Sequence, residues 1–222
     1  SLNSHDRGVR GLTRSGGCLS ISVEYRLAPE HPFPAAVSDS LAALQWVVEN
    51  ARRFDGDPTR VAVGGDSAGG NLAAVTALGA RESGPDLAFQ LLIYPVVDSD
   101  LKRDSYKTFA NAPMLPGHRM TYFWEQYVPN LDQRTDWRCA PLRAESHAGL
   151  PPALVIGAGI DPLVDEGKVY AEKLISSGVQ VKYKLFPRMT HAFFQAPGLL
   201  DDARAASNAA GAELRVAFGT HS

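Results

Sequence analysis

A serine flanked by glycines marks the chemistry that this sequence is best equipped to perform. The run Gly65–Gly69 reads Gly-Asp-Ser-Ala-Gly, and it lies between an apolar run and a stretch of small residues. In that context, a sharp strand-to-helix turn strains the serine, and the glycines let neighbouring backbone approach closely. The following helix directs its amides to the place where an oxyanion would form. We therefore expect Ser67 to be a nucleophile and the Ala68 amide to be an oxyanion donor.

A serine nucleophile needs a general base, and the chain has six histidines as candidates. Only His191 closely follows a predicted strand, in a loop beyond its carboxyl end, where α/β sheets build their sites. Its place downstream of Ser67 favours a role as the base. The other histidines lie near the chain ends, in a proline-rich loop or in an irregular segment: His5, His31, His118, His147 and His221.

The acid that orients the histidine is sought among carboxylates at strand ends. Asp161 directly follows one apolar run, and Asp98 follows another and is its nearest rival. Asp165 and Glu166 lie one turn beyond Asp161, at an expected helix start, where helix capping is the better explanation. We favour Asp161, because the order Ser, Asp, His then places acid and base on successive loops.

Short apolar runs alternate with amphipathic stretches, which predicts an α/β fold with a mostly parallel sheet and helices on both faces. A continuous apolar run is typical of a strand buried on both sides. The last run, Val179–Leu185, instead alternates with lysines on one face and is expected at a sheet edge. The pattern predicts further strands at Leu19–Val23, Val61–Val63, Leu91–Tyr94 and Leu154–Ile156, and helices at Ala35–Phe54, Ala68–Ala80, Leu163–Ser177 and Leu199–Phe218.

The segment 98–150 interrupts this alternation with four prolines and an aromatic cluster. We interpret it as an excursion off the carboxyl edge of the sheet, with one helix around Gly117–Tyr127. Without a repeat or a linker, residues 1–222 are expected to form a single domain. Candidates to line a substrate pocket, with packing onto the sheet as the alternative for the aromatic ones, are Asp66, Tyr122, Phe123, Trp124, Phe193 and Phe194.

Composition excludes several classes of protein. The chain has 222 residues, of which 45% are apolar and 21% charged, values typical of a globular domain. The formal net charge of −2 has no block of like charge, so nothing indicates nucleic acid or membrane partners. No apolar run approaches the ~18 residues of a membrane helix. Cys18 and Cys139 are too few for a disulfide framework and fit a reducing compartment at least as well as an oxidising one, so we expect a cytoplasmic location.

Five motifs carry a resemblance to a known family. They read Tyr25-Arg-Leu-Ala-Pro-Glu-His-Pro-Phe-Pro-Ala-Ala, Gly65-Asp-Ser-Ala-Gly-Gly-Asn, Leu150-Pro-Pro-Ala-Leu-Val, Asp161-Pro-Leu-Val-Asp-Glu-Gly and His191-Ala-Phe-Phe. Together they resemble the bacterial hormone-sensitive-lipase-like esterases (family IV) of the α/β-hydrolase superfamily, over essentially the whole chain. The resemblance implies a Ser67, Asp161 and His191 triad and a carboxylesterase acting on short- to medium-chain acyl esters. It also implies that no cofactor or metal is needed and that a homodimer can form through the last strand and helix.

The chain departs from that family at its amino-terminal end. Family members carry a His-Gly-Gly-Gly loop that forms most of the oxyanion hole, ahead of the segment resembling Ser1–Asp6; here that loop, the cap helices and the first three strands are absent. In the family's strand order, one absent strand lies between those ending near Tyr25 and Gly64. Its loss would leave buried backbone groups unpaired, at ~1–3 kcal/mol each. We therefore expect this to be the carboxyl-terminal two-thirds of a longer polypeptide, or another segment to supply the strand.

Two other classes of function stay open. An amidase, thioesterase or acyltransferase would use the same triad on a different acyl donor, and a chain with one oxyanion donor would be weakly active or inactive. A binding module, such as the plant hormone receptors that reuse this fold, is disfavoured because those lack a complete triad.

Overall fold

The computed structural model describes residues 1–220 and shows an α/β fold built on a four-stranded parallel sheet. The strand order is β1-β2-β3-β4, and each strand pairs in parallel with the next one along the chain. Parallel strands end at the same edge, so the residues that follow them are brought together there. The strands are β1 (Ala62–Asp66), β2 (Phe89–Ile93), β3 (Ala153–Ile160) and β4 (Val181–Thr190).

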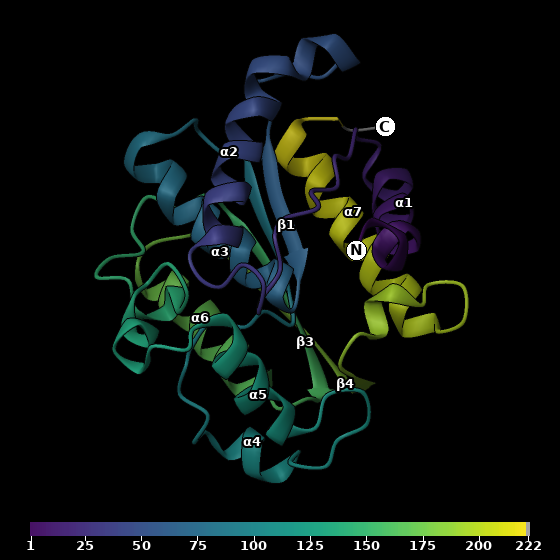
Figure 1. Cartoon of the computed structure of the whole chain (residues 1–222). Helices are drawn as coiled ribbons and strands as arrows, with labels where there is room; N and C mark the ends of the chain where they lie inside the picture. Colours follow the sequence, from purple (N-terminus) through teal and green to yellow (C-terminus); the bar gives the residue numbers. More distant parts are fainter. Residues whose placement is uncertain (221–222) are drawn as a thin grey trace.

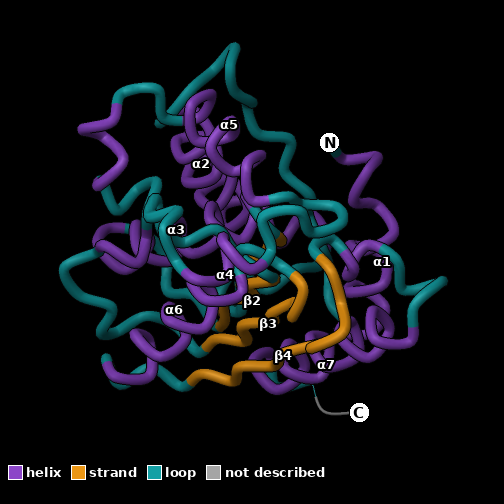
Figure 2. Tube along the Cα trace, turned by 90° about the horizontal axis from the view of Figure 1, so that it is seen from below, coloured by secondary structure: helices purple, strands orange, loops and turns teal. Residues whose placement is uncertain are grey.

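Helices cover both faces of the sheet. Helices α1 and α7 pack against each other on one side, and α2, α3 and α6 lie on the other (Figure 1). Figure 2 shows the same separation, with α7 below the orange strands and α3 on the opposite side. The helices are α1 (Leu2–Gly16), α2 (Ala35–Asn50), α3 (Ala68–Ser83), α4 (Asp104–Thr108), α5 (Gly117–Tyr127), α6 (Val164–Ser176) and α7 (Asp201–Phe218), and short 3-10 turns lie at Ala51–Phe54, Leu131–Thr135, Pro141–Arg143 and Phe193–Gln195.

Successive residues of the central strands face opposite layers of the core. Leu91 packs in the cluster that includes α7, whereas Leu92 packs in the cluster that includes α3 and α6. Helix α7 contributes Ala203, Ala206 and Ala210 to the first cluster, and all three are fully buried. Burial on both faces is the physical reason that these strands are apolar at nearly every position, with the buried Gln90 of β2 as an exception, and it confirms the predicted fold class.

Strand β4 lies at the edge of the sheet, as its alternating pattern predicts. Lys182 and Lys184 are exposed, and the Lys182 ammonium lies 2.7 Å from the Glu213 carboxylate on α7. The strand continues to Thr190, further than predicted, because its second half still pairs with β3 beyond an irregularity in register. His191 therefore follows the strand directly.

The predicted buried strand Leu19–Val23 is wrong. These residues form neither helix nor strand, and Leu19, Ile21 and Val23 are 54%, 41% and 39% exposed. The physical reason is the absence of a partner among the described residues: β1 ends the sheet on that side, and an extended segment without a neighbour forms no hydrogen-bonded ladder. A groove of about 540 Å³ separates the segment Leu19–Val23 from β1, and α2 also lines it. It lies where a further strand is expected, and the supply of that strand by another segment stays a prediction.

The remaining differences concern local helices. Helices α1 and α4 are not predicted, and α2 gives way to a 3-10 turn at Ala51. Helix α1 begins with a capping box between Ser1 and Ser4. Helix α5 in the excursion has the predicted bounds, and it packs onto the body of the fold through a cluster that contains Trp124 and Leu163. Among residues 1–220, no helix combines the length and apolar character needed to cross a membrane.

Candidate active site

Ser67 lies in a sharp turn between β1 and α3. Its backbone has φ 56° and ψ −118°, a strained conformation for a residue with a side chain. A Cβ at Gly65 would overlap the backbone of Gly69, so this turn requires glycine at position 65. The Ser67 amide donates to the Ile93 carbonyl at 2.9 Å, which ties the turn to β2. Ala68 is the first residue of α3, so its N–H has no acceptor within the helix and is available to an oxyanion.

The structure brings Ser67, His191 and Asp161 into one hydrogen-bonded row. Nε2 of His191 lies 2.9 Å from Oγ of Ser67, and Nδ1 lies 2.6 Å from Oδ2 of Asp161. Asp161 is fully buried and His191 is 8% exposed. Because a carboxylate can only accept at Nδ1, the neutral imidazole carries its proton there and leaves Nε2 free to accept from the serine.

Three strand ends position this row. Ser67 follows β1, Asp161 follows β3 and His191 follows β4, all at the same edge of the parallel sheet. Asp161 is held further by its second oxygen, Oδ1, which accepts a 2.9 Å hydrogen bond from the Leu163 amide. The loop after His191 is anchored by the buried side chain of Phe193. The predicted strand ends thus account for the meeting of all three residues.

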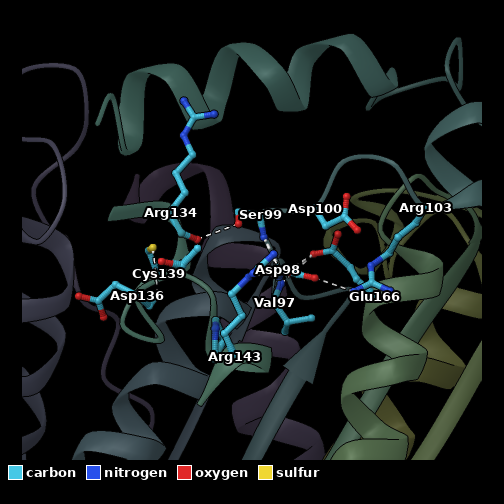
Figure 3. Close-up of polar contacts among 12 residues, drawn as sticks. Val97, Asp98, Ser99, Asp100, Arg103, Arg134, Asp136, Cys139, Arg143 and Glu166 are labelled. Atoms are coloured by element: carbon cyan, nitrogen blue, oxygen red, sulfur yellow. Dashed lines mark hydrogen bonds and ion pairs between the residues drawn. The ribbon is translucent and has the colours of Figure 1, made fainter. Parts of the chain in front are cut away.

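Asp98, the rival for the acid, lies in a separate ion-pair cluster (Figure 3). Its Oδ1 accepts from Nε of Arg143 at 2.7 Å, and its Oδ2 accepts from Nη2 of Arg103 at 2.6 Å. Asp98 is 4% exposed, and it is Asp161, not Asp98, that contacts His191. The geometry therefore agrees with the choice of Asp161.

The capping interpretation of Asp165 and Glu166 is wrong. Glu166 is fully buried, and its Oε1 accepts from the amides of Val97 at 2.8 Å and Asp98 at 3.4 Å. Its Oε2 accepts from the Tyr106 hydroxyl at 2.8 Å. Burial raises the pKa of the Glu166 carboxyl to about 8, against the lowering effect of these hydrogen bonds. No local motif distinguishes a helix-start carboxylate that caps its own helix from one that is buried under a distant segment.

The start of the excursion makes hydrogen bonds to the loop that carries Asp161. The Ser105 hydroxyl donates to the Pro162 carbonyl at 2.6 Å, and the Ser105 amide donates to Oδ2 of Asp165 at 2.8 Å. With the Tyr106 bond to Glu166, these contacts span both sides of the turn between β3 and α6. These hydrogen bonds from the start of the excursion thus hold the loop of the candidate acid in place.

The expected pocket residues divide into three groups. Asp66 lines the groove beside β1, where its Oδ1 lies 3.3 Å from Nε2 of His5. Trp124, Phe193 and Phe194 are each 3% exposed and belong to core clusters, so packing, the alternative stated for them, describes their place. Tyr122 and Phe123 are exposed on the outer side of α5, at 56% and 46%.

The sequence motifs assign no role to two further residues around the site. Tyr94 lies with its ring 4.7 Å from that of His191, between centroids. Asn71, on the first turn of α3, donates to the carbonyls of Val96 at 2.8 Å and Cys139 at 2.7 Å, and so joins the nucleophile helix to the excursion. In residues 1–220, no group of three or more His, Cys, Asp or Glu side chains is arranged to hold a metal ion.

Comparison with known proteins shows the family to which the chain belongs. The sequence profile described as "alpha/beta hydrolase fold" matches residues 1–195. The chain belongs to this family. It is 45% identical over 196 residues to the carboxylesterase NlhH of Mycobacterium tuberculosis, a match that covers 86% of this chain and 61% of that protein. It is 37% identical over 205 residues to an ethyl acetate hydrolase of Pseudomonas putida, covering 91% of this chain and 64% of that one.

Solved structures of esterases superpose closely on this α/β-hydrolase chain. The carboxylesterase EstE1, cloned from a metagenomic library, matches with a TM-score of 0.94 and 42% identity, over 98% of this chain and 75% of that one. A mutant of the esterase rPPE, complexed with (S)-Ac-CPA, matches with a TM-score of 0.95 and 39% identity, over 98% and 70%. The chain spans about three-fifths of the length of the two curated relatives above, 61% and 64%.

Proposed function

We propose that this α/β-hydrolase chain carries the catalytic residues of a carboxylesterase that hydrolyses short- to medium-chain acyl esters. The observation that carries the proposal is the row from Ser67 through His191 to Asp161, with contacts of 2.9 Å and 2.6 Å. The names of the relatives, a carboxylesterase and an ethyl acetate hydrolase, support an ester as the acyl donor.

In the proposed reaction, Ser67 attacks the ester carbonyl while Nε2 of His191 takes its proton. Asp161 holds the imidazole in the required tautomer and stabilises the cation that forms. His191 then protonates the leaving alcohol, and a water molecule, activated by the same base, discharges the acyl-enzyme. The serine proton leaves with the alcohol, and a proton from the water molecule returns to Ser67 through His191, so the cycle consumes only the ester and one water.

The negative charge of the tetrahedral intermediate develops near the amino end of α3. The Ala68 amide is the donor that this chain offers, assisted by the helix dipole. Loss of one oxyanion donor costs roughly 10²–10³ in kcat. We therefore propose that turnover by these 222 residues alone is weak unless another segment contributes further donors.

Hydrolysis of p-nitrophenyl esters from C2 to C12 by the chain and by Ser67→Ala tests the proposal. We expect activity that falls to the background rate in Ser67→Ala, with a preference for the shorter esters. Equal rates for the two proteins would remove the esterase assignment. The same pair assayed on p-nitroanilides and acyl thioesters decides between an esterase and the amidase, thioesterase or acyltransferase alternatives.

Cytoplasmic location and homodimer formation are further parts of the proposal. The free thiols of Cys18 and Cys139 support a reducing compartment, and Lys182 on the exposed edge of β4 weighs against strand pairing between two copies. Sedimentation equilibrium of the chain measures the oligomeric state, and a single species of 23.9 kDa would contradict the dimer.

A further inference from the structure

Tyr94 lies against the imidazole of His191 from a strained position at the end of β2. The ring centroids are 4.7 Å apart, with an angle of 53° between the planes. The φ of Tyr94 is 34°, a value that is unfavourable for a residue with a side chain. Strain of this kind persists only where the surroundings hold it, and it is concentrated at functional sites. The strained backbone presents the ring to the candidate base.

The Tyr94 ring is held on several sides. Its hydroxyl donates a 3.3 Å hydrogen bond to Oδ2 of Asp66, the neighbour of Ser67. Its ring meets that of Phe193 at 5.8 Å between centroids, and the residue is 2% exposed. Burial raises the pKa of the hydroxyl well above its ordinary value, so the phenol stays neutral. Tyr94 thus links the turn that carries Ser67 to the loop that carries His191.

We propose that Tyr94 is a positioning residue for His191, whose ring face orients the imidazole and stabilises the imidazolium formed when the base takes the serine proton. The inference rests on the proposed function, because that function makes His191 the base. A cation within about 6 Å of an aromatic face is attracted by the ring quadrupole, more strongly where water is excluded. Asp161 stabilises the same cation at Nδ1, and the Tyr94 ring lies beside the imidazole, 4.7 Å away between centroids.

The proposal is tested by the pKa of the His191 imidazole, measured by NMR titration of the 222-residue chain. In Tyr94→Leu, which removes the aromatic face, we expect this pKa to fall by about half a unit to one unit. Tyr94→Phe keeps the face and should retain most of the wild-type value, as a rescue by the conservative variant. In an active chain, the acid limb of the kcat/KM profile should move to lower pH by the same amount.

A matched control separates positioning from loss of core packing. Tyr170 is fully buried, and its ring lies 5.4 Å from that of His147, between centroids, in a different core cluster. Tyr170→Leu and Tyr170→Phe remove the same atoms from that cluster and should leave the His191 titration unchanged. An equal fall in the His191 pKa in Tyr170→Leu would overturn the inference, as would an unchanged pKa in folded Tyr94→Leu.

Two points keep the outcomes distinct. If Tyr94→Leu does not fold, Tyr94→Met, which is unbranched and lacks an aromatic face, replaces it under the same criteria. The titration needs no turnover, so it decides the role of Tyr94 even in a weakly active chain. Equal ester hydrolysis by the chain and Ser67→Ala contradicts the proposed function, whereas an unmoved His191 pKa in a chain that does hydrolyse esters contradicts only the inference about Tyr94.

Discussion

The Tyr106 hydroxyl donates a 2.8 Å hydrogen bond to Oε2 of Glu166, and this contact joins the excursion to the helix that follows the candidate acid. Both partners are buried, Glu166 completely. The buried carboxyl has a pKa raised to about 8 by desolvation. The Glu166 carboxyl is therefore one of the groups that hold the Asp161 loop in place, and it makes the stability of the fold depend on pH.

Glu166→Gln should change how stability depends on pH. The folded pKa lies above the unfolded value of about 4.3, so the native state holds a proton that the unfolded state releases. The free energy of unfolding contributed by Glu166 is thus greatest below about pH 4 and is lost as pH rises toward 8. Between pH 5 and 8, wild type should lose stability relative to Glu166→Gln by an amount on the order of a few kcal/mol.

Urea denaturation at several pH values measures this difference. Glu172→Gln is the control, because Glu172 lies on the exposed side of the same helix. Its stability should follow that of wild type across the range. A constant difference between Glu166→Gln and wild type from pH 5 to 8 would show that the Glu166 carboxyl does not titrate there.

Asp161→Asn should leave the fold nearly intact and suppress ester hydrolysis. The amide can still accept at Oδ1 from Leu163, but it no longer holds the imidazole in the tautomer that accepts the serine proton. In other triads such a change lowers kcat by about 10⁴. Steady-state kinetics on a p-nitrophenyl ester, with unfolding monitored in parallel, tests the claim; retained kcat would reject Asp161 as the acid.

Asp98→Asn should show the opposite pattern. Removing this charge leaves Arg103 and Arg143 without their shared carboxylate in a mostly buried cluster. Breaking a buried pair costs about 3–5 kcal/mol, and the partial exposure of both arginines places the expected loss near the lower end of that range. The kcat of the folded protein should stay within a few-fold of wild type. A large fall in kcat without loss of stability would make Asp98 part of the catalytic machinery.

The edge of β1 beside the groove should be open to hydrogen exchange. Val61 accepts from Ala88, and Ser67 donates to Ile93, so the two-residue alternation directs the N–H groups of Ala62 and Gly64 away from β2. In the 222-residue chain, these two amides should exchange about 10²-fold faster than those paired with β2.

Residue-resolved exchange by NMR checks the groove prediction, with the neighbouring amides of Val63 and Gly65 as internal controls. The controls point to β2 and should stay protected. Equal, strong protection of all four amides would mean that a strand, whether from a second copy or from another segment, already occupies the groove.

The sequence predicts the central strands well because their burial is visible in the apolar residues of each strand itself. Leu91–Tyr94 and Leu154–Ile156 are apolar at each position since both faces are covered, and the structure confirms both. The run Leu19–Val23 alternates its apolar residues with Ser20 and Ser22, and it forms no strand. Hydropathy reports what a segment could bury, whereas a ladder also needs a neighbour, and no pattern within a segment reveals whether that neighbour is present.

The site shows the same division between local and long-range signals. Ser67, Asp161 and His191 could be predicted from their places at strand ends, because parallel topology alone brings such places together. Tyr94 and Glu166 could not. Their roles depend on a strained backbone in one case and on burial under a segment some 60 residues away in the other, as the Tyr106 contact shows.

Ser67→Gly should be more stable than Ser67→Ala, although both lack the nucleophile. At φ 56° and ψ −118° any side chain strains the backbone, and glycine removes that strain. Strain of this kind costs on the order of 1–3 kcal/mol, against about 0.5–1 kcal/mol of extra unfolded-state entropy for glycine. We therefore expect Ser67→Gly to exceed Ser67→Ala by about 1 kcal/mol in the free energy of unfolding, measured by urea denaturation.

The control is the same pair of substitutions at Ser207, within helix α7. There, Ser207→Ala should be more stable than Ser207→Gly because helical backbone disfavours glycine. If Ser67→Ala proved at least as stable as Ser67→Gly, the turn at Ser67 would store no strain.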